Sequence, residues 1–271
     1  MARWTLDDIA WRRFDQAKID PDIVRIVKAS ALVEYNGGAY AHHLCRVFGD
    51  DPGFQVCATR WGEEEIQHGR ALGRWAELAD PGFDFAAAFV RFKEDFRIDF
   101  DRASSRRGSR AGEMVARCIV ESATSSYYQA LRDMAEEPVL KQICHNIAAD
   151  EVRHYKLFYR TLERYLDAEP IGMWRRLWVA VGRLAEGQDD ELASAYHAAN
   201  DAAAPYDRRR HARAYARRAF AVYREPHIAR GTRMILRAAG LAPRGPVANA
   251  AARLAWAALR YRAARLAANG A

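Results

Sequence analysis

One arrangement of glutamates and histidines occurs twice in this chain, and it limits the fold more than any other feature. Each copy has a glutamate followed, further along the chain, by a Glu-x-x-His pair: Glu34, Glu65 and His68 in the first half, and Glu121, Glu151 and His154 in the second. The two glutamates are 31 residues apart in one copy and 30 in the other. That interval fits two antiparallel helices joined by a short loop, with these residues at mid-height. The repeat therefore predicts two helical hairpins.

The residue types in this repeat are those of a metal site. A glutamate and a histidine three residues apart lie on the same face of a helix. Two such pairs, with one glutamate from each of two other helices, form the ligand set of a dinuclear site inside a four-helix bundle. Buried carboxylates would repel one another without cations, and mixed oxygen and nitrogen donors suit iron or manganese. We therefore expect two iron ions, with a manganese–iron pair as the alternative, rather than a solvated charged face.

Apolar periodicity and helix-breaking residues predict where the helices lie. A crossover helix is expected over 83–101, where phenylalanines recur at nearly helical spacing, between the two hairpins. The four bundle helices are expected over residues 21–48, 53–78, 111–136 and 138–167.

Two features of the first hairpin, a pair of glycines and a pair of adjacent glutamates, can each be interpreted in two ways. Gly37 and Gly38 lie about one turn after Glu34, where they would serve either close helix packing or space for a substrate. Glu64 lies four residues before His68 and competes with Glu65 as a ligand on geometry alone. The matching interval in the second half favours Glu65.

The last hundred residues differ from the rest in charge. Residues 171–271 contain eighteen arginines, no lysine and seven acids, a net charge of +11 that leaves −4 for residues 1–170. We expect residues 1–170 to form the bundle domain and residues 171–271 to form a basic helical extension packed on or beside it. Arginine-rich helical stretches are expected over 191–223, 226–239 and 246–268, broken by Pro205, Pro226 and Gly240–Pro246. The stretch 247–266 would lie at a membrane surface or pack on the bundle, and its alanine content favours packing.

The expected location is the cytoplasm. The chain has no apolar run of about eighteen residues, and its first residues lack an apolar signal core. The basic extension implies an anionic partner, so peripheral contact at the inner face of the membrane is a further expectation.

Two stretches resemble a known family. Residues 61–69 (WGEEEIQHG) look like a W-x-x-E-E-x-x-H-G stretch, and residues 142–154 (QICHNIAADEVRH) look like Q-I-C-x-x-I-A-A-D-E-x-R-H. Both stretches are found in the soluble acyl-acyl-carrier-protein desaturases of the stearoyl type, which belong to the ferritin-like di-iron carboxylate superfamily. Glu121 and Thr124 are similar to a ligand and a nearby active-site threonine in that family. The resemblance covers roughly residues 30–165.

The resemblance implies an all-α fold, a ferritin-like four-helix bundle to which this chain adds C-terminal helices. It implies that Thr124 is catalytic, on the oxygen-binding side of the metals. It implies that Trp61 and Asp150 lie around the histidines, where they orient ligands or conduct electrons. The implied iron ligands are Glu34, Glu65, His68, Glu121, Glu151 and His154.

The implied activity is an oxygen-dependent oxidation, desaturation or hydroxylation, of a fatty acyl chain carried by acyl carrier protein or by a lipid. Electrons would come from a ferredoxin-like donor, because the chain has no cysteine-rich or flavin motif. We also expect a homodimer.

Two other functions are compatible with the same residues. A ferritin-like ferroxidase or iron-binding protein would oxidise iron without an organic substrate, although it would leave the C-terminal hundred residues without a role. A nucleic-acid or membrane-binding module would use the eighteen arginines. Nucleic acid is not expected, because the chain has no base-reading motif.

Overall fold

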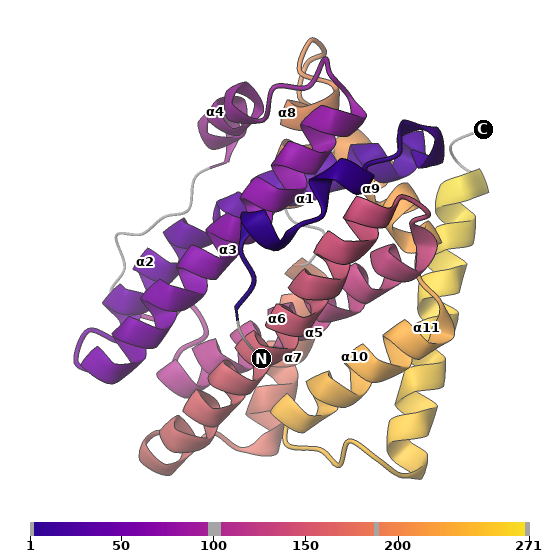
Figure 1. The fold of residues 1–271 in the computed structure, drawn as a ribbon. Coiled ribbons are helices and arrows are strands. Elements are labelled where there is room, and N and C mark those ends of the chain that lie inside the picture. Colours follow the sequence, from indigo (N-terminus) through magenta and orange to yellow (C-terminus); the bar gives the residue numbers. More distant parts are fainter. Residues whose placement is uncertain (1–2, 97–103, 187–189, 269–271) are drawn as a thin grey trace.

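The computed structural model describes residues 3–96, 104–186 and 190–268, and within them the fold is all-α, as predicted (Figure 1). Four long helices form the bundle. α1 pairs with α3, and α5 pairs with α6, so the two predicted hairpins are present. The bundle helices are α1 (Pro21–Tyr35), α3 (Pro52–Ala79), α5 (Arg110–Met134) and α6 (Pro138–Ala168).

Each bundle helix begins at a side chain that accepts hydrogen bonds from its first backbone N–H groups. These capping residues are Asp20, Asp51, Ser109 and Glu137. Proline follows three of the four caps, at the position where a helix does not need the missing N–H. The helix starts are therefore encoded locally.

The predicted helix over 21–48 is wrong in one respect, because it is divided at Asn36 into α1 and α2 (Gly37–Val47). The Asn36 side chain binds elements outside the hairpin: its carbonyl accepts from Lys93 Nζ (2.9 Å) and its amide donates to Glu191 Oε1 (3.1 Å). At Gly37, an added Cβ would overlap the side chain of Glu65. The glycine pair therefore serves close packing of α2 on α3, rather than space for a substrate.

Several helices lie outside the bundle. The crossover helix α4 (Phe85–Asp95) is shorter than predicted, and the end of the predicted range, 97–101, falls outside the described residues. The stretch over 191–223 is divided into two helices, and Pro205 lies in the break between them, as predicted. The C-terminal helices are α7 (Met173–Glu186), α8 (Asp190–Asn200), α9 (Arg208–Ala221), α10 (Glu225–Ala238) and α11 (Pro246–Ala268).

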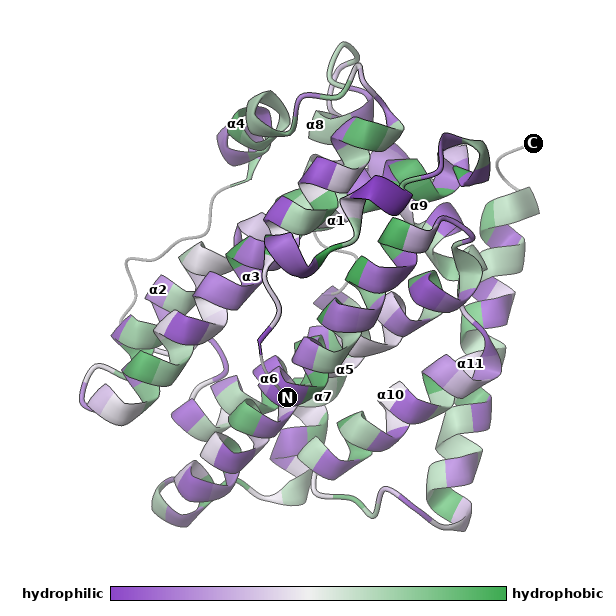
Figure 2. Ribbon diagram, viewed as in Figure 1, coloured by the Kyte–Doolittle hydropathy of each residue, from purple (hydrophilic) through white to green (hydrophobic). Residues whose placement is uncertain are grey.

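The C-terminal helices pack against the bundle and against one another. α8 lies on α1, α7 and α10 lie on α5, and α11 lies on α9 and α10. α11 thus packs on the neighbouring C-terminal helices, and the favoured alternative, packing of this stretch on the bundle itself, stays a prediction. No helix in the described ranges is long and apolar enough to cross a membrane, and Figure 2 shows hydrophilic residues interrupting every helix. The division of the chain into two domains at residue 170 stays a prediction.

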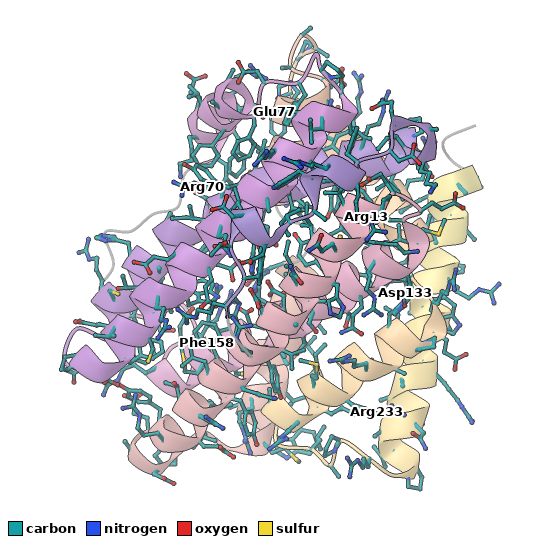
Figure 3. All side chains as sticks on the ribbon, in the orientation of Figure 1. Arg13, Arg70, Glu77, Asp133, Phe158 and Arg233 are labelled. Atoms are coloured by element: carbon teal, nitrogen blue, oxygen red, sulfur yellow. The ribbon has the colours of Figure 1, made fainter. Side chains whose placement is uncertain are left out.

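The apolar core has two parts. One is built on α1 and the C-terminal half of α3, and the other on α2 and the N-terminal half of α3. Phe158 of α6 belongs to the second part and lies between α6 and α3 (Figure 3), with its ring 5.3 Å from that of Trp61. α3, α5 and α6 pass from one part to the other, and α1 of the first part is followed along the chain by α2 of the second. The repeated glutamates and histidines lie between the two parts.

Candidate metal centre

The six predicted ligands converge inside the bundle. All six side chains are buried, and they come from α1, α3, α5 and α6. Their donor atoms form two groups, in each of which all the atoms lie within 4.8 Å of one another. Glu65 and Glu151 belong to both groups. The first group is Glu34, Glu65, His68 and Glu151, and the second is Glu65, Glu121, Glu151 and His154.

Both histidines turn the same ring nitrogen toward the carboxylates. His68 Nδ1 is 3.4 Å from Glu34 Oε2 and 3.4 Å from Glu151 Oε1. His154 Nδ1 is 3.0 Å from Glu65 Oε1 and 3.5 Å from Glu121 Oε2. One nitrogen of each ring therefore faces the carboxylate cluster, and Nε2 faces away from it.

Each outward nitrogen meets another carboxylate. His68 Nε2 lies 3.1 Å from Asp150 Oδ2, and His154 Nε2 lies 2.7 Å from Glu64 Oε2. A carboxylate at this position holds the proton on Nε2 and leaves Nδ1 free to bind a metal. Asp150 was predicted beside the histidines. Glu64 was considered only as a rival ligand, although it precedes Glu65 as Asp150 precedes Glu151.

Trp61 also lies beside a histidine, as predicted. Its ring packs edge-on against His154, with centroids 6.5 Å apart and planes 88° apart. Its Nε1 is buried and has no hydrogen-bond partner among the described residues. Trp61 therefore packs against the ligand, and its role in orienting the ligand or conducting electrons stays a prediction.

The first residues of the chain cover the outer side of the site, which the sequence did not indicate. Trp4 Nε1 donates to Asp150 Oδ2 (2.8 Å), and the Trp4 ring is parallel to the His68 ring at 6.0 Å. Arg3 pairs with Glu64. Arg153 connects the two outer carboxylates, since it pairs with Asp150 and donates to Glu64 (3.1 Å).

Two hydroxyl groups of α5 bind the ligand carboxylates. Tyr128 donates to Glu34 Oε1 (2.6 Å), and Thr124 donates to Glu151 Oε2. Thr124, the predicted catalytic residue, is thus in contact with the site, and its catalytic role stays a prediction. Tyr128 is four residues further along the same face, and that spacing could have suggested its contact with the site.

Burial and repulsion between the carboxylates change the pKa values of the groups at this site. Burial, followed by the charges of Glu151 and Glu34, raises the pKa of Glu65 well above its ordinary value. Burial and the charge of Glu151 raise the pKa of Glu121 to about 8. Burial disfavours the charged form of His68, but the carboxylates around it outweigh burial and raise its pKa. The protein alone therefore retains protons at this site, where divalent cations would replace them.

The residues fit a pair of metal ions. Among the described residues, four buried atoms of this cluster have no hydrogen-bond partner: Glu65 Oε1, Glu121 Oε2, Glu151 Oε1 and His154 Nδ1. Buried polar atoms are normally paired, and unpaired ones are costly. All four belong to the second group of donor atoms, so one cation could satisfy them together.

Comparison with protein families places more than half of the chain in one of them. A family model described as "Fatty acid desaturase" matches residues 31–179, which include all six predicted ligands. This match corrects the narrower resemblance to acyl-acyl-carrier-protein desaturases, because the matching model is described only as fatty acid desaturase. A search of curated proteins finds no match to the chain.

Proposed function

Because this chain belongs to the fatty acid desaturase family, we propose that it is an oxygen-dependent di-iron oxidase that acts on a fatty acyl chain. The family supports a fatty-acyl desaturase type of oxidoreductase. The observation that carries the di-iron part is the orientation of the two histidines, which turn Nδ1 toward four buried carboxylates and Nε2 toward Asp150 and Glu64. Four carboxylates and two imidazoles, one imidazole in each group of donor atoms, suit two iron ions. A manganese–iron pair is the alternative.

In this proposal the two donor groups hold one ion each. Glu34 and His68 would bind one ion, Glu121 and His154 would bind the other, and Glu65 and Glu151 would contact both. The pair of ions would supply the redox chemistry by which dioxygen oxidises an unactivated C–H bond.

Side chains next to the six ligands would fix the orientation of those ligands and keep protons beside the ligand carboxylates. Thr124 and Tyr128 each donate a hydrogen bond from the hydroxyl to a ligand carboxylate, and Tyr128 is almost fully buried. Thr124 is the group we assign to proton transfer at Glu151, because it is partly accessible. Asp150, Glu64 and Arg153 would hold the histidine rings in the metal-binding tautomer.

The electron balance requires a reductant. Removing two hydrogens from an acyl chain supplies two of the four electrons that reduce dioxygen to water. The other two must come from a donor, and a ferredoxin-like protein is the donor that we propose. The acyl chain would be presented by acyl carrier protein or by a lipid, and the product would be an unsaturated or a hydroxylated chain.

The test is reconstitution with ferrous iron, a reducing system and oxygen, followed by mass spectrometry of acyl thioesters and phospholipids. The proposal expects loss of two hydrogens or gain of one oxygen in the acyl chain. Glu151→Ala should abolish the product, whereas Glu63→Ala, a change at an exposed neighbour of the site, should not. Iron oxidation that leaves every acyl substrate unchanged would instead favour a ferritin-like ferroxidase.

A further inference from the structure

The helix α7 presents an apolar face to solvent. Trp174 and Trp178 are 76% and 73% exposed, and Val181 and Leu184 are 55% and 48% exposed. Trp174, Trp178 and Val181 follow at intervals of four and three residues, so they lie on one face of the helix. Exposed tryptophans on one helix face form a contiguous apolar patch, which usually marks a contact site.

The side of α7 that faces the protein is mixed, with two arginines beside two small or medium apolar residues. Arg176 and Arg183 are half-buried and share a face with the buried Val179 and Ala180. Arg176 lies against Gly240, where an added Cβ would overlap its guanidinium group. The charge of Arg183 acts on the buried Glu191, whose pKa burial nevertheless raises. Val179 and Ala180 are thus the only buried apolar residues of α7, and larger apolar side chains of this helix, the two tryptophans among them, are left facing solvent.

Basic residues lie at the edge of the exposed apolar face of α7. Arg175 is exposed, and its guanidinium donates to the backbone carbonyl of Arg107 (3.3 Å). Arg107 in turn pairs with Glu186, the one acidic residue of α7. The exposed Arg106 lies next to Arg107 in the same loop. Of these four charged residues within the described ranges, three are arginines and one is an acid.

We propose that the α7 face binds the surface of an anionic phospholipid membrane. An amphipathic helix with tryptophan on its apolar side lies in the plane of the interface, and basic residues at its edge contact anionic headgroups. Tryptophan suits this position, because its ring is apolar and its N–H reaches water. A second copy of the chain fits less well, since a two-fold contact would bring the arginines of both rims together.

This inference concerns a surface apart from the metal centre, so it can fail while the proposed oxidase activity holds. If both hold, lipid-borne acyl chains are the substrates that the protein meets at the membrane.

Flotation of the full chain with vesicles tests the proposal. Vesicles containing phosphatidylglycerol should carry the protein, and vesicles of phosphatidylcholine alone should carry much less. Trp174→Ser with Trp178→Ser should lower partitioning to anionic vesicles by about tenfold or more, because two large apolar side chains no longer leave water. The matched control is Leu254→Ser with Tyr261→Ser, a change at two exposed residues of α11 that should leave partitioning unchanged.

Fluorescence locates the contact. Brominated anionic lipids should quench the wild-type tryptophan emission, and Trp174→Phe with Trp178→Phe should retain binding but lose most of that quenching.

No vesicle binding by the wild type would overturn the proposal. It would also be overturned if the serine variant bound vesicles normally. Loss of a dimer in that variant without any lipid effect would identify the face as a contact between two copies, and selective loss of binding to an acidic carrier protein would identify that partner instead.

Discussion

The Nε2 atom of His154 lies 2.7 Å from the carboxylate of Glu64, in the position that Asp150 occupies beside His68. Each imidazole is thus held by the acid that directly precedes a ligand glutamate on a bundle helix: Glu64 before Glu65 for His154, and Asp150 before Glu151 for His68. The two halves of the site support each other, because the acid on each helix holds the histidine of the other.

Glu64→Gln should weaken metal binding by about tenfold to a hundredfold, as changes to groups that orient metal-binding histidines commonly do. The amide no longer draws the proton to Nε2, so Nδ1 is less available. Titration against a competing chelator measures the effect. Glu63→Gln, at the exposed neighbouring position, should bind metal as the wild type does, and equal affinity in both variants would contradict the assignment.

Glu151→Ala should lose both metal ions, whereas Glu121→Ala should keep one. Glu151 belongs to both groups of donor atoms, and Glu121 to only one. Metal analysis of purified variants gives the stoichiometry. Two metals per chain in Glu151→Ala would show that the ligand assignment is wrong.

Metal removal should make stability depend on pH. In the protein without metal, burial and nearby charges raise the pKa of Glu121 to about 8 and that of Glu65 above its ordinary value. The folded state then holds protons that the unfolded state has released above about pH 4.5. The contribution of these two groups to stability is therefore greatest below that pH and falls as the pH rises through their folded-state pKa values, by at most about 1.4 kcal/mol per pH unit for each group.

The measurement is the Tm of chelator-treated protein between pH 5 and pH 8.5, beside the metal-loaded protein. The treated protein should lose Tm steadily, and the loaded protein should change less, since cations replace the protons. A treated protein that becomes more stable as the pH rises would contradict this reading.

Glu137→Ala should destabilise the fold by about 2–4 kcal/mol. The Glu137 carboxylate caps α6 through Val139 N–H and Leu140 N–H, and it accepts from the buried Trp75 Nε1 (2.7 Å). Alanine would remove the cap and leave the indole N–H without its partner. Urea unfolding measures the loss, and Glu136→Ala at the exposed neighbour should change stability little.

Gly69→Ala should destabilise the protein by about 1–3 kcal/mol. An added Cβ would lie 2.5 Å from the backbone nitrogen of Tyr35, so α1 and α3 would have to separate next to Glu34 and His68. Gly53→Ala on the same helix is the control. There the nearest atom lies at 3.6 Å, and the change should be neutral or stabilising. Thermal unfolding and iron content of both variants would test this pair.

The sequence predicted the centre of the molecule better than its surroundings. The spacing of six ligands fixes four helices, because each ligand must reach one point, and the caps at Asp20, Asp51, Ser109 and Glu137 encode the helix starts. The division at Asn36 was not predictable, because it depends on Lys93 and Glu191 from distant segments. Trp4 and Arg3 were missed for the same reason, since their partners lie far away in the sequence.

The role of Glu64 beside His154 was missed for a different reason. The signal was present in the acid that precedes the ligand in both halves of the repeat. Considered alone, Glu64 is a rival of Glu65. Only a comparison of the two copies position by position assigns it the role of Asp150.

The position of Trp4 has a practical consequence for how the protein is shortened. The family match begins at residue 31, so a version trimmed to the matched region would omit the indole that lies on His68 and binds Asp150. Such a trimmed protein would keep all six ligands in its sequence. It would nevertheless lose residues 21–30 of α1, the helix that carries Glu34, and expose the side of His68 that Trp4 covers.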